Sequence, residues 1–350
     1  MKYPIPKPFV EKEVRLSGKF SFEMLKSINN LYTPVRKKIV TQYFDDNKYN
    51  LLKNGIALRK RSEKKSTLLE LKIDRGQGKS LEWVSDITKN NIQGFIHYNF
   101  QDLPIEETLK EKRLVPQNLP FQKIVKQSNK VFQTDILRTT WTANYKGSIF
   151  TICFDEGKIL CQTREQLINE IEIEVQQDEK NLLLEFFGNL WVKLPNSFYQ
   201  GRSKALRGFE LRKNQQLTFR VIKKQKTIST ISFQKIKTDL MSAIAVLDYF
   251  SCLFCENGGK SPVNCLRNSL LEIKTLLLFV FGASSIFNKK QLRAIIRNIH
   301  RMEKSIGLTE KKVNSYHTVN IFQLYKSHTD LLLSLYKFAE TLNKFSGLNR

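Results

Sequence analysis

Two segments of the chain alternate strictly between apolar and ionisable residues, and no other feature of the sequence restricts the fold as strongly. Residues 69–74 read Leu-Glu-Leu-Lys-Ile-Asp, and residues 170–175 read Glu-Ile-Glu-Ile-Glu-Val. Because successive side chains of a β-strand point to opposite faces, each segment predicts a strand with one apolar face and one wholly ionisable face. Shorter alternations recur at residues 11–15 and 59–61. The chain is therefore expected to build a sheet with a charged side.

The charges on these faces are sorted by segment. For any one strand, the ordinary interpretation is a half-buried antiparallel sheet whose polar face is solvated. Exposed strands, however, usually mix cations, carboxylates and hydroxyl groups so that neighbouring strands can pair. In this chain the carboxylates gather at Glu11, Glu13, Glu170, Glu172 and Glu174, and the cations at Arg59, Arg61 and Lys72. If the sheet closes into a barrel with these faces inward, its lumen has opposed acidic and basic walls, which suit an anionic ligand that carries a metal ion.

Opposed walls of this kind match what a chain of phosphates requires. Arginine binds phosphate oxygens through two parallel hydrogen bonds, and lysine acts as a compact point charge. Carboxylates hold Mg²⁺ or Mn²⁺ through hard oxygen ligands, and the metal neutralises phosphate oxygens as charge moves to the leaving group. Since phosphoryl transfer has a loose transition state, positioning and electrostatics carry the rate without a protein nucleophile. No Ser/His/Asp set is then required, and the sequence suggests none.

The composition indicates a folded, strongly basic protein. The 350 residues include 58 Lys+Arg and 33 Asp+Glu, a formal net charge of +25, and 41% are hydrophobic. That apolar fraction excludes disorder as the main state. The longest nearly uncharged apolar run, residues 275–287, is shorter than the roughly 18 residues of a bilayer span, so we expect no membrane span. Five cysteines and an N-terminus without an apolar signal segment favour a reducing compartment, and we expect a cytoplasmic protein.

The hydrophobic period changes along the chain and predicts two domains, 1–215 and 225–350. The first is expected to be a large antiparallel sheet, with strands at 9–16, 35–44, 56–63, 67–74, 81–87, 132–141, 148–155, 159–164, 168–176 and 203–211. Amphipathic helices at 22–31 and 178–194 would cover its outside. The second is expected to be all-helical, with helices at 231–255, 263–281, 289–306 and 319–342. The predicted fold class is therefore α+β, followed by an all-α helical bundle.

The same charged segments carry a resemblance to a known family. The signature of the CYTH superfamily, the triphosphate tunnel metalloenzymes, is similar to three runs here: Tyr43-Phe44-Asp45-Asp46, Leu51-Leu52, and Gly55-Ile56-Ala57-Leu58-Arg59-Lys60-Arg61. Further matches follow in the family's order: Leu69-Glu70-Leu71-Lys72, Glu82-Trp83, Arg138 before Trp141, Phe154-Asp155-Glu156-Gly157, Glu170 to Glu174, and Ser203-Lys204-Ala205-Leu206-Arg207-Gly208. The resemblance spans about residues 9 to 211 and implies an antiparallel, eight-stranded β-tunnel that hydrolyses a triphosphate with Mg²⁺ or Mn²⁺.

The resemblance also implies roles for individual residues. The triphosphate would be bound by Arg15, Arg59, Arg61, Lys72, Arg138 and Lys204. The metal would be bound by Glu13, Glu170, Glu172 and Glu174. Catalysis would involve Glu11, Glu13, Arg15 and Asp155, with Asp155 near the metal and the attacking water. The family's opening motif is Glu-x-Glu-x-Lys, so Arg15 is a departure that keeps the charge, changes its geometry and bears on rate and product preference.

The helical tail resembles a CHAD domain, the basic helical module that often follows a CYTH domain and is associated with polyphosphate. Residues 263–267 stand where that family shows a His-containing, Arg-rich helix, but no histidine is present there. The tail is also long enough for only one of the usual two bundles, so the resemblance implies a truncated, degenerate version. The apolar tail helices leave open a role in forming a homodimer or binding another protein.

Three other features are better explained by packing or turns than by chemistry. The run Gly76-Gln77-Gly78-Lys79-Ser80 lacks the first glycine of a phosphate-binding loop, since Ile73 stands there, and it predicts a hairpin turn. Cys252 and Cys255 lie in a helical apolar pattern without a second Cys pair or a nearby His, so they predict buried thiols. The histidines at 97, 300, 317 and 328 are scattered and are expected to have surface or packing roles.

The leading hypothesis is a metal-dependent hydrolase of a triphosphate, with inorganic tripolyphosphate as substrate and orthophosphate as product. The pairing with a CHAD-like tail favours the inorganic substrate, by analogy alone. Thiamine triphosphatase and adenylate cyclase are the alternatives within the enzyme class. From another class, a non-catalytic basic protein could bind polyphosphate or nucleic acid through its net charge. Such a binder gains nothing from carboxylates that face its ligand, so nucleic acid is not expected as a specific partner.

Overall fold

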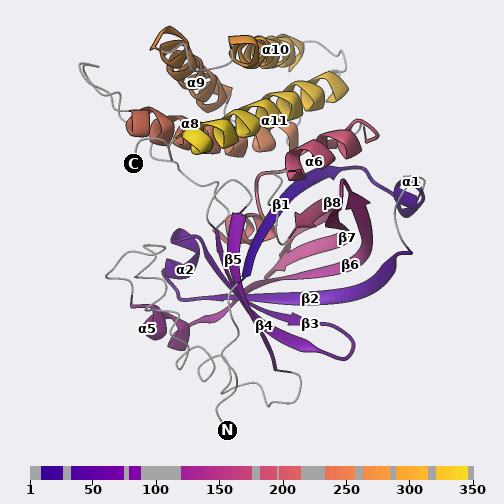
Figure 1. Ribbon diagram of the computed structural model, residues 1–350. Coiled ribbons are helices and arrows are strands. Elements are labelled where there is room, and N and C mark those ends of the chain that lie inside the picture. The colour runs from indigo at the N-terminus through magenta and orange to yellow at the C-terminus, as the bar shows by residue number, and fades with distance from the viewer. Residues whose placement is uncertain are drawn as a thin grey trace. The chain divides into compact units, whose positions relative to one another are not determined.

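The first part of the chain folds into a closed β-barrel (Figure 1). The computed structural model describes residues 9–26, 33–74, 79–87, 120–175, 182–194, 197–213, 233–256, 263–283, 289–313 and 321–345. Its strands are β1 (Phe9–Gly18), β2 (Val35–Asp45), β3 (Ile56–Ser62), β4 (Thr67–Asp74), β5 (Lys79–Asp86), β6 (Asn129–Tyr145), β7 (Ser148–Cys161), β8 (Arg164–Val175) and β9 (Ser197–Tyr199). The sheet order is β5-β4-β3-β2-β6-β7-β8-β1-β9, and β1 also pairs with β5, which closes eight strands into a ring. The predicted α+β class and eight-stranded antiparallel tunnel are confirmed.

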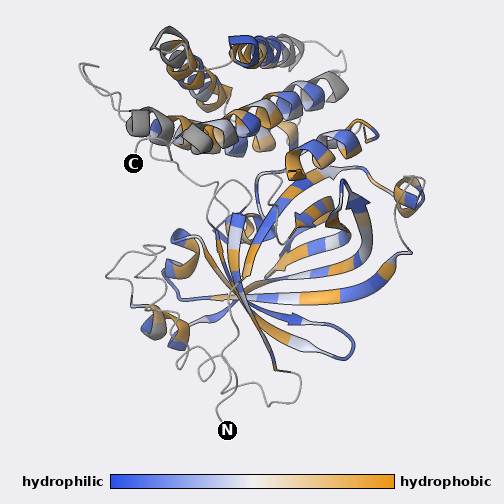
Figure 2. Cartoon of the chain, viewed as in Figure 1, coloured by the Kyte–Doolittle hydropathy of each residue, from blue (hydrophilic) through white to orange (hydrophobic). Residues whose placement is uncertain are grey.

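The strand register turns apolar side chains outward and charged side chains into the barrel. Arg59 on β3 lies opposite Glu70 on β4, so both point to the same face. The other face of β4 is buried in an outer core through Leu69, Leu71 and Ile73. The short helices α2 (Asn50–Lys53) and α5 (Phe121–Lys126) contribute to that core and cover this side of the barrel. In Figure 2 the strands accordingly alternate between orange and blue segments.

Aromatic side chains cover the barrel on the side of β6 and β7. Phe22 in α1 (Phe22–Lys26) stacks on Trp141 of β6 with ring centroids 6.0 Å apart. Phe150 of β7 stacks on a ring of α6 (Leu183–Trp191) at 4.5 Å. Each such pair contributes about 0.5–1.5 kcal/mol beyond the burial of its surface. Both predicted covering helices are therefore present among the described residues.

The segment predicted as a strand at 203–211 is instead a helix, α7 (Lys204–Lys213). Ser203 Oγ accepts a hydrogen bond from the backbone N–H of Leu206 at 3.2 Å, which is the capping interaction that begins a helix. Gly208 allows the helix to approach β6, because a Cβ there would lie 2.2 Å from the ring of Phe132. A short alternation of apolar and charged residues does not by itself distinguish strand from helix, and here the cap and the packing decide.

The predicted break between the strands at 148–155 and 159–164 is also wrong, because β7 runs from Ser148 to Cys161 without interruption and β8 begins at Arg164. The predicted break falls at Gly157, which lies within β7. A Cβ at Gly157 would lie 2.1 Å from the carbonyl oxygen of Asp135 on β6. Glycine is needed there because two backbones approach closely, rather than because the chain turns. The turn into β8 comes later, at Gln162, whose φ is 55°.

Some predicted features fall outside the described residues. They are parts of elements at 27–31, 176, 178–181, 231–232 and 319–320, the turn residues 76–78, and the histidines at 97 and 317. The other two residues of the predicted turn, Lys79 and Ser80, belong to β5.

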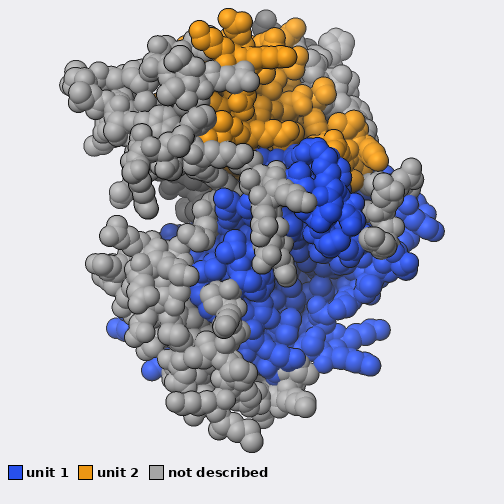
Figure 3. Space-filling view, viewed as in Figure 1, with its two compact units in different colours: residues 1–15, 20–186, 202–217 blue, residues 16–19, 187–201, 218–350 orange. Residues whose placement is uncertain are grey.

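The chain divides into two compact units, coloured separately in Figure 3. The first comprises residues 1–15, 20–186 and 202–217, and the second comprises residues 16–19, 187–201 and 218–350. The second unit contains α8 (Phe233–Glu256), α9 (Val263–Ala283), α10 (Lys289–Val313) and α11 (Ile321–Phe345). These are the four helices predicted for the tail. Its resemblance to a CHAD domain and its role in binding a second copy or another protein stay predictions.

One described helix is long and apolar enough to cross a membrane, by length and composition. It is the segment Thr238–Glu256 of α8, with a mean hydropathy of 1.4. Within the second unit, 67% of this segment is buried, as it is in the core helix of a globular domain, so it is weak evidence for a span. The expectation of no membrane span was argued from residues 275–287 and overlooked this helix.

Two cysteines of the second unit are buried thiols, as predicted for them. Cys252 and Cys255 are free and buried, and burial raises the pKa of both thiols well above the ordinary value. Cys252 Sγ accepts a hydrogen bond from the backbone N–H of Gly201 at 3.2 Å and lies 3.3 Å from Asp248 Oδ1. These contacts tie α8 to the segment that follows β9.

His328 on α11 makes the second unit sensitive to acid. Its buried Nε2 lies 2.8 Å from the carbonyl oxygen of Tyr199 on β9. Burial lowers the pKa of His328 from 6.5 to about 4, although the hydrogen bond to Tyr199 acts in the opposite direction. The unfolded chain therefore takes up a proton near pH 6.5 that the folded chain accepts only near pH 4. We expect full stability above pH 6.5 and a loss of about 3 kcal/mol as the pH falls to 4.

Urea unfolding at pH 7, 5.5 and 4, followed by circular dichroism, measures this effect. His328→Gln retains an N–H donor for Tyr199 but does not titrate, so its stability is expected to fall less steeply than that of wild type. His300→Gln is the matched control, because His300 is exposed on α10. Equal pH slopes for wild type and His328→Gln would contradict the assignment.

Candidate active site

One side of the lumen carries Arg59 and Arg61 on β3 and Lys72 on β4, which we call the basic wall. Arg59 Nε lies 2.5 Å from Glu70 Oε2, and Arg61 Nη1 lies 3.3 Å from Glu70 Oε1. Lys72 Nζ contacts three carboxylates, Glu82 at 2.6 Å, Glu11 at 2.8 Å and Glu13 at 3.3 Å. Burial opposes the charge of Arg59, but the neighbouring carboxylates outweigh it and raise the pKa above its ordinary value. The wall is therefore cationic at neutral pH.

The other side carries four carboxylates on β7 and β8, which we call the acidic wall: Asp155, Glu170, Glu172 and Glu174. Arg138 on β6 donates two hydrogen bonds to Asp155, from Nε at 2.7 Å and from Nη2 at 2.6 Å, and its Nη2 lies 2.5 Å from Glu172. Lys204 at the start of α7 lies 2.6 Å from Asp155 and 2.8 Å from Glu172, and it also contacts Glu170. Arg207, one turn further along α7, pairs with Glu170. The carboxylates of the acidic wall thus form ion pairs with one cation from β6 and two from α7.

The two walls meet at Glu13 on β1. Glu13 Oε2 lies 3.3 Å from Lys72 of the basic wall. A carboxylate oxygen of Glu13 lies within 4.8 Å of those of Glu172 and Glu174 in the acidic wall. Arg15 donates a hydrogen bond to Glu13 Oε1 at 2.7 Å. The ionic faces of the strands therefore converge around one enclosed lumen, as the sequence predicted.

The cations around the acidic wall keep part of it ionised. Burial on its own would raise the pKa values of Asp155 and Glu172, but Arg138 and Lys204 lower both below their ordinary range. Burial raises the pKa of Glu174 to about 7, because Arg138 offsets it only in part and Glu172 adds repulsion. Asp155 and Glu172 are therefore ionised at neutral pH, whereas Glu174 holds a proton for part of the time.

A second pair of acids, Glu11 and Glu82, adjoins Lys72. Burial raises the pKa of Glu11 to about 8, with Lys72 acting against the shift. Burial also disfavours the charge of Glu82, but Arg59 and Lys72 overcome it and lower the pKa of Glu82 to about 2. At neutral pH Glu11 holds a proton while Glu82 is ionised, so the two acids have different capacities for proton transfer.

Two groups of carboxylates among the described residues have ligand oxygens close enough together to hold a metal ion. They are Glu13, Glu172 and Glu174, and Asp155, Glu170 and Glu172, with oxygens within 4.8 Å of one another in each group. Glu170 Oε1 is buried in the described structure and already contacts one cation, Lys204 Nζ, so the site attracts positive charge. Ligand sets made only of carboxylates suit hard divalent cations such as Mg²⁺ and Mn²⁺. The residues present therefore fit a divalent metal.

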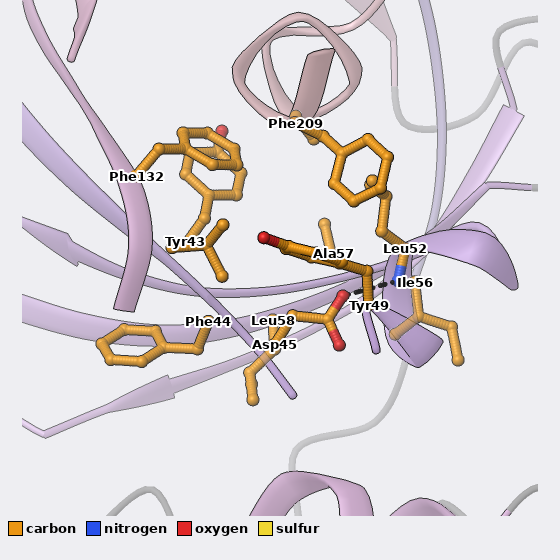
Figure 4. A pocket seen from close by; sticks show the side chains of 12 residues that line it. Tyr43, Phe44, Asp45, Tyr49, Leu52, Ile56, Ala57, Leu58, Phe132 and Phe209 are labelled. Carbon is orange, nitrogen blue, oxygen red and sulfur yellow. Dashed lines mark hydrogen bonds between the residues drawn. The ribbon is translucent and has the colours of Figure 1, made fainter. Parts of the chain in front are cut away.

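Aromatic rings line a small pocket of the barrel unit (Figure 4). Tyr43 lies opposite Arg59 in the β2–β3 register and stacks on Phe132 with ring centroids 4.4 Å apart. Tyr49 meets the ring of Phe209 on α7 edge-on at 4.7 Å. The cavity left between these rings has a volume of about 20 Å³, which is room for one water molecule. The pocket is too small for a larger group.

The two aspartates that follow Tyr43 and Phe44 have a structural role. Asp45 accepts hydrogen bonds from the backbone N–H groups of Leu51 at 3.1 Å and Leu52 at 3.0 Å, the second of which is drawn in Figure 4. Asp46 accepts two hydrogen bonds from Asn50. This part of the signature therefore holds α2 against the end of β2 rather than contributing to the acidic wall.

The structure places every predicted site residue around this lumen: Glu11, Glu13, Arg15, Arg59, Arg61, Lys72, Arg138, Asp155, Glu170, Glu172, Glu174 and Lys204. Their individual roles stay predictions. Glu70, Glu82 and Arg207 also line the lumen, and the sequence argument assigned them no role. Glu70 and Glu82 lie on the inward faces of their strands, as the predicted site residues do. The alternation of side chains along a strand could therefore have identified them from the sequence. Arg207 was missed because a strand would turn Lys204 and Arg207 to opposite faces, whereas a helix places residues three apart on one side.

The residues that form this lumen are similar in sequence to known proteins. The model of the CYTH domain family matches residues 11–209. An inorganic triphosphatase of Haemophilus influenzae is 29% identical over 178 residues, which cover 50% of this chain and 46% of that protein, so the chain spans less than half of the relative's length.

Two solved structures are similar to part of this chain at lower sequence identity. A protein from Hippeastrum reported to have a dominant triphosphatase activity is 17% identical, with a TM-score of 0.38, over 60% of this chain and 97% of that chain. A protein from Pyrococcus horikoshii is 18% identical, with a TM-score of 0.36, over 57% of this chain and 98% of that chain. Since the family model covers more than half of the residues, including both walls of the lumen, the chain belongs to the CYTH domain family.

Proposed function

We propose that the protein is a divalent-metal-dependent triphosphatase that hydrolyses inorganic tripolyphosphate to pyrophosphate and orthophosphate inside the barrel. The observation that carries this proposal is the meeting of the two walls at Glu13. A phosphate anion on Lys72 and a cation on Glu172 would lie side by side there, since Glu13 contacts Lys72 at 3.3 Å and its carboxylate lies within 4.8 Å of that of Glu172.

Each part of the lumen has a task in this reaction. Arg59, Arg61 and Lys72 bind phosphate oxygens and hold the chain of phosphates in line. Mg²⁺ or Mn²⁺, when bound by the acidic wall, supplies charge neutralisation and a polarised water. Arg138 and Lys204 keep the carboxylates ionised, which is the state that binds a metal. Glu11, whose pKa is about 8, carries a proton at neutral pH and is suited to donate it to the departing phosphate.

The pocket at the Tyr43–Phe132 stack supports an inorganic substrate over an organic triphosphate directed toward it. An organic triphosphate carries a nucleoside or thiamine group beyond its phosphates, and this pocket, of about 20 Å³, has no room for one. The Haemophilus influenzae relative, called an inorganic triphosphatase, supports the same choice. Thiamine triphosphate and ATP stay alternatives, with their organic groups directed away from this pocket.

A substrate panel tests the proposal. Tripolyphosphate, thiamine triphosphate, ATP and long-chain polyphosphate are each incubated with the full chain and Mg²⁺ or Mn²⁺, and released orthophosphate is measured. We expect the fastest release from tripolyphosphate and none after the metal is removed with a chelator. Faster release from an organic triphosphate would overturn the choice of substrate, and no release from any of the four would overturn the enzyme assignment.

The net charge of +25 favours a second candidate, a non-catalytic binder of polyphosphate or nucleic acid. That candidate predicts a steep salt dependence of binding and no effect of substitutions in the acidic wall. The four carboxylates of the acidic wall weaken this candidate, because they repel a polyanion that carries no metal.

A further inference from the structure

The basic wall is already paired with acidic side chains of the described residues, and of these only Glu13 belongs to a candidate metal group. Lys72 contacts Glu11 and Glu82, and the two arginines share Glu70. Glu70 differs from Glu11 and Glu82 because its ion pairs with the described residues are with guanidinium groups, whereas Glu11 and Glu82 pair with Lys72. A phosphate that binds Arg59 and Arg61 must therefore compete with the Glu70 carboxylate for the two guanidinium groups.

Glu70 divides its two oxygens between the two arginines. Oε2 accepts a hydrogen bond from Arg59 Nε at 2.5 Å, and Oε1 lies 3.3 Å from Arg61 Nη1. The Glu70 side chain is only 3% exposed, so its charge is screened weakly by solvent. Buried Arg61 Nε has no hydrogen-bond partner in the described structure, so this guanidinium keeps a free donor for a ligand. Glu70 therefore forms a buried ion pair with each arginine, and Arg61 keeps one N–H group that can bind an anion.

Glu70 does not supply the apolar packing of β4. The neighbouring Leu69 and Leu71 on the opposite face of the strand pack into the outer core. A neutral residue at 70 would keep that packing and would leave both arginines to the ligand. A carboxylate at this position instead weakens phosphate binding, because each phosphate must displace Glu70 from some of the guanidinium N–H groups.

We propose that Glu70 is a resident counter-ion that competes with phosphate for Arg59 and Arg61, and that it thereby weakens the hold of the lumen on triphosphate and on its products. The cost of displacing Glu70 is the same for each anion. Pyrophosphate, which brings less charge than tripolyphosphate, retains less net affinity after that cost, and so it leaves the site readily. This inference deepens the triphosphatase function proposed above and rests on it.

Isothermal titration of tripolyphosphate and of pyrophosphate into the full chain, without metal, tests the competition. Glu70→Gln keeps the size and an acceptor oxygen but removes the charge. Its dissociation constants for both anions are expected to fall by about 10- to 100-fold, the range for a hydrogen bond to a charged group. Glu70→Asp, which keeps the charge, is expected to bind as weakly as wild type. In turnover assays Glu70→Gln is expected to show a lower KM, stronger inhibition by pyrophosphate and no gain in kcat.

The matched control is Glu156→Gln on the outer face of β7, where Glu156 lies 3.7 Å from Arg36 and is 36% exposed. It is expected to bind both anions as wild type does. If Glu70→Gln does not fold, Glu70→Thr removes the same charge with a residue that suits a strand. Unchanged or weaker anion binding in a folded, uncharged variant would overturn the proposal, and so would a wild type that binds neither anion. A wild type that binds tripolyphosphate without hydrolysing it would overturn the proposed function alone, because the titration needs no turnover.

Discussion

Glu172→Gln is expected to lower kcat/KM for tripolyphosphate by about 10²- to 10³-fold, which corresponds to the several kcal/mol that a metal ion contributes to a phosphoryl-transfer transition state. Glu172 is the one residue shared by both candidate metal groups. Glutamine has nearly the same shape but binds a divalent cation poorly, since it brings no charge. The loss should therefore appear in the metal concentration needed for half-maximal activity as well as in kcat.

Glu165→Gln is the matched control, because Glu165 lies on the same strand but is 54% exposed and pairs with Lys158. Its kinetics are expected to equal those of wild type. Calorimetric titration with Mn²⁺ separates lost metal binding from lost folding. Activity of Glu172→Gln within a few-fold of wild type at saturating metal would refute the assignment of the acidic wall as the metal site.

Lys204→Met is expected to destabilise the folded protein by about 3–5 kcal/mol, the cost of removing one partner from a buried ion network. Lys204 is 8% exposed and contacts Asp155, Glu170 and Glu172. Methionine fills similar space without charge, so the three carboxylates lose a shared cation. Urea unfolding at pH 7 measures the loss, and Lys158→Met, on the exposed surface of β7, is expected to change stability little.

The sign of the pH dependence follows from the same contacts. Lys204 lowers the pKa values of Asp155 and Glu172, so the stability from this pairing is present above the ordinary carboxyl pKa and is lost as the pH falls through the lower folded values. The difference between wild type and Lys204→Met should therefore shrink in acid. Addition of Mg²⁺ should stabilise the variant more than wild type, because a divalent cation can take the place of the ammonium. A stability difference that neither acid nor Mg²⁺ reduces would contradict this account.

The strands and the inward direction of the charges could be predicted because both depend on local alternation. In β4 and β8 every second residue is apolar, and burying that set leaves one choice of face for Glu70, Lys72 and the acidic residues. The convergence of Arg59 and Glu172 in one lumen also needs closure between β1 and β5, which joins residues far apart in the chain. The family resemblance supplied that step, and the residue pattern alone did not.

The errors come from contacts that a local pattern does not contain. Helix α7 was read as a strand because its preference is decided by Ser203 at its start and by the fit of Gly208 against Phe132. The division of β7 was misjudged because Gly157 is required by the backbone of β6, which is remote in sequence. Glu70 was seen to face inward, but its pairing with two arginines depends on the β3–β4 register, which fixes distances that the sequence leaves open.

Helix α7 contributes both to the aromatic cluster and, through Lys204 and Arg207, to the neutralisation of the acidic wall. Residues 204–213 follow the eight strands of the ring in the chain, so they leave the ribosome after them. A nascent chain that has completed β8 but not α7 therefore lacks two of the cations that pair with the carboxylates of β7 and β8. The acidic wall gains these partners only once this short helix has been translated.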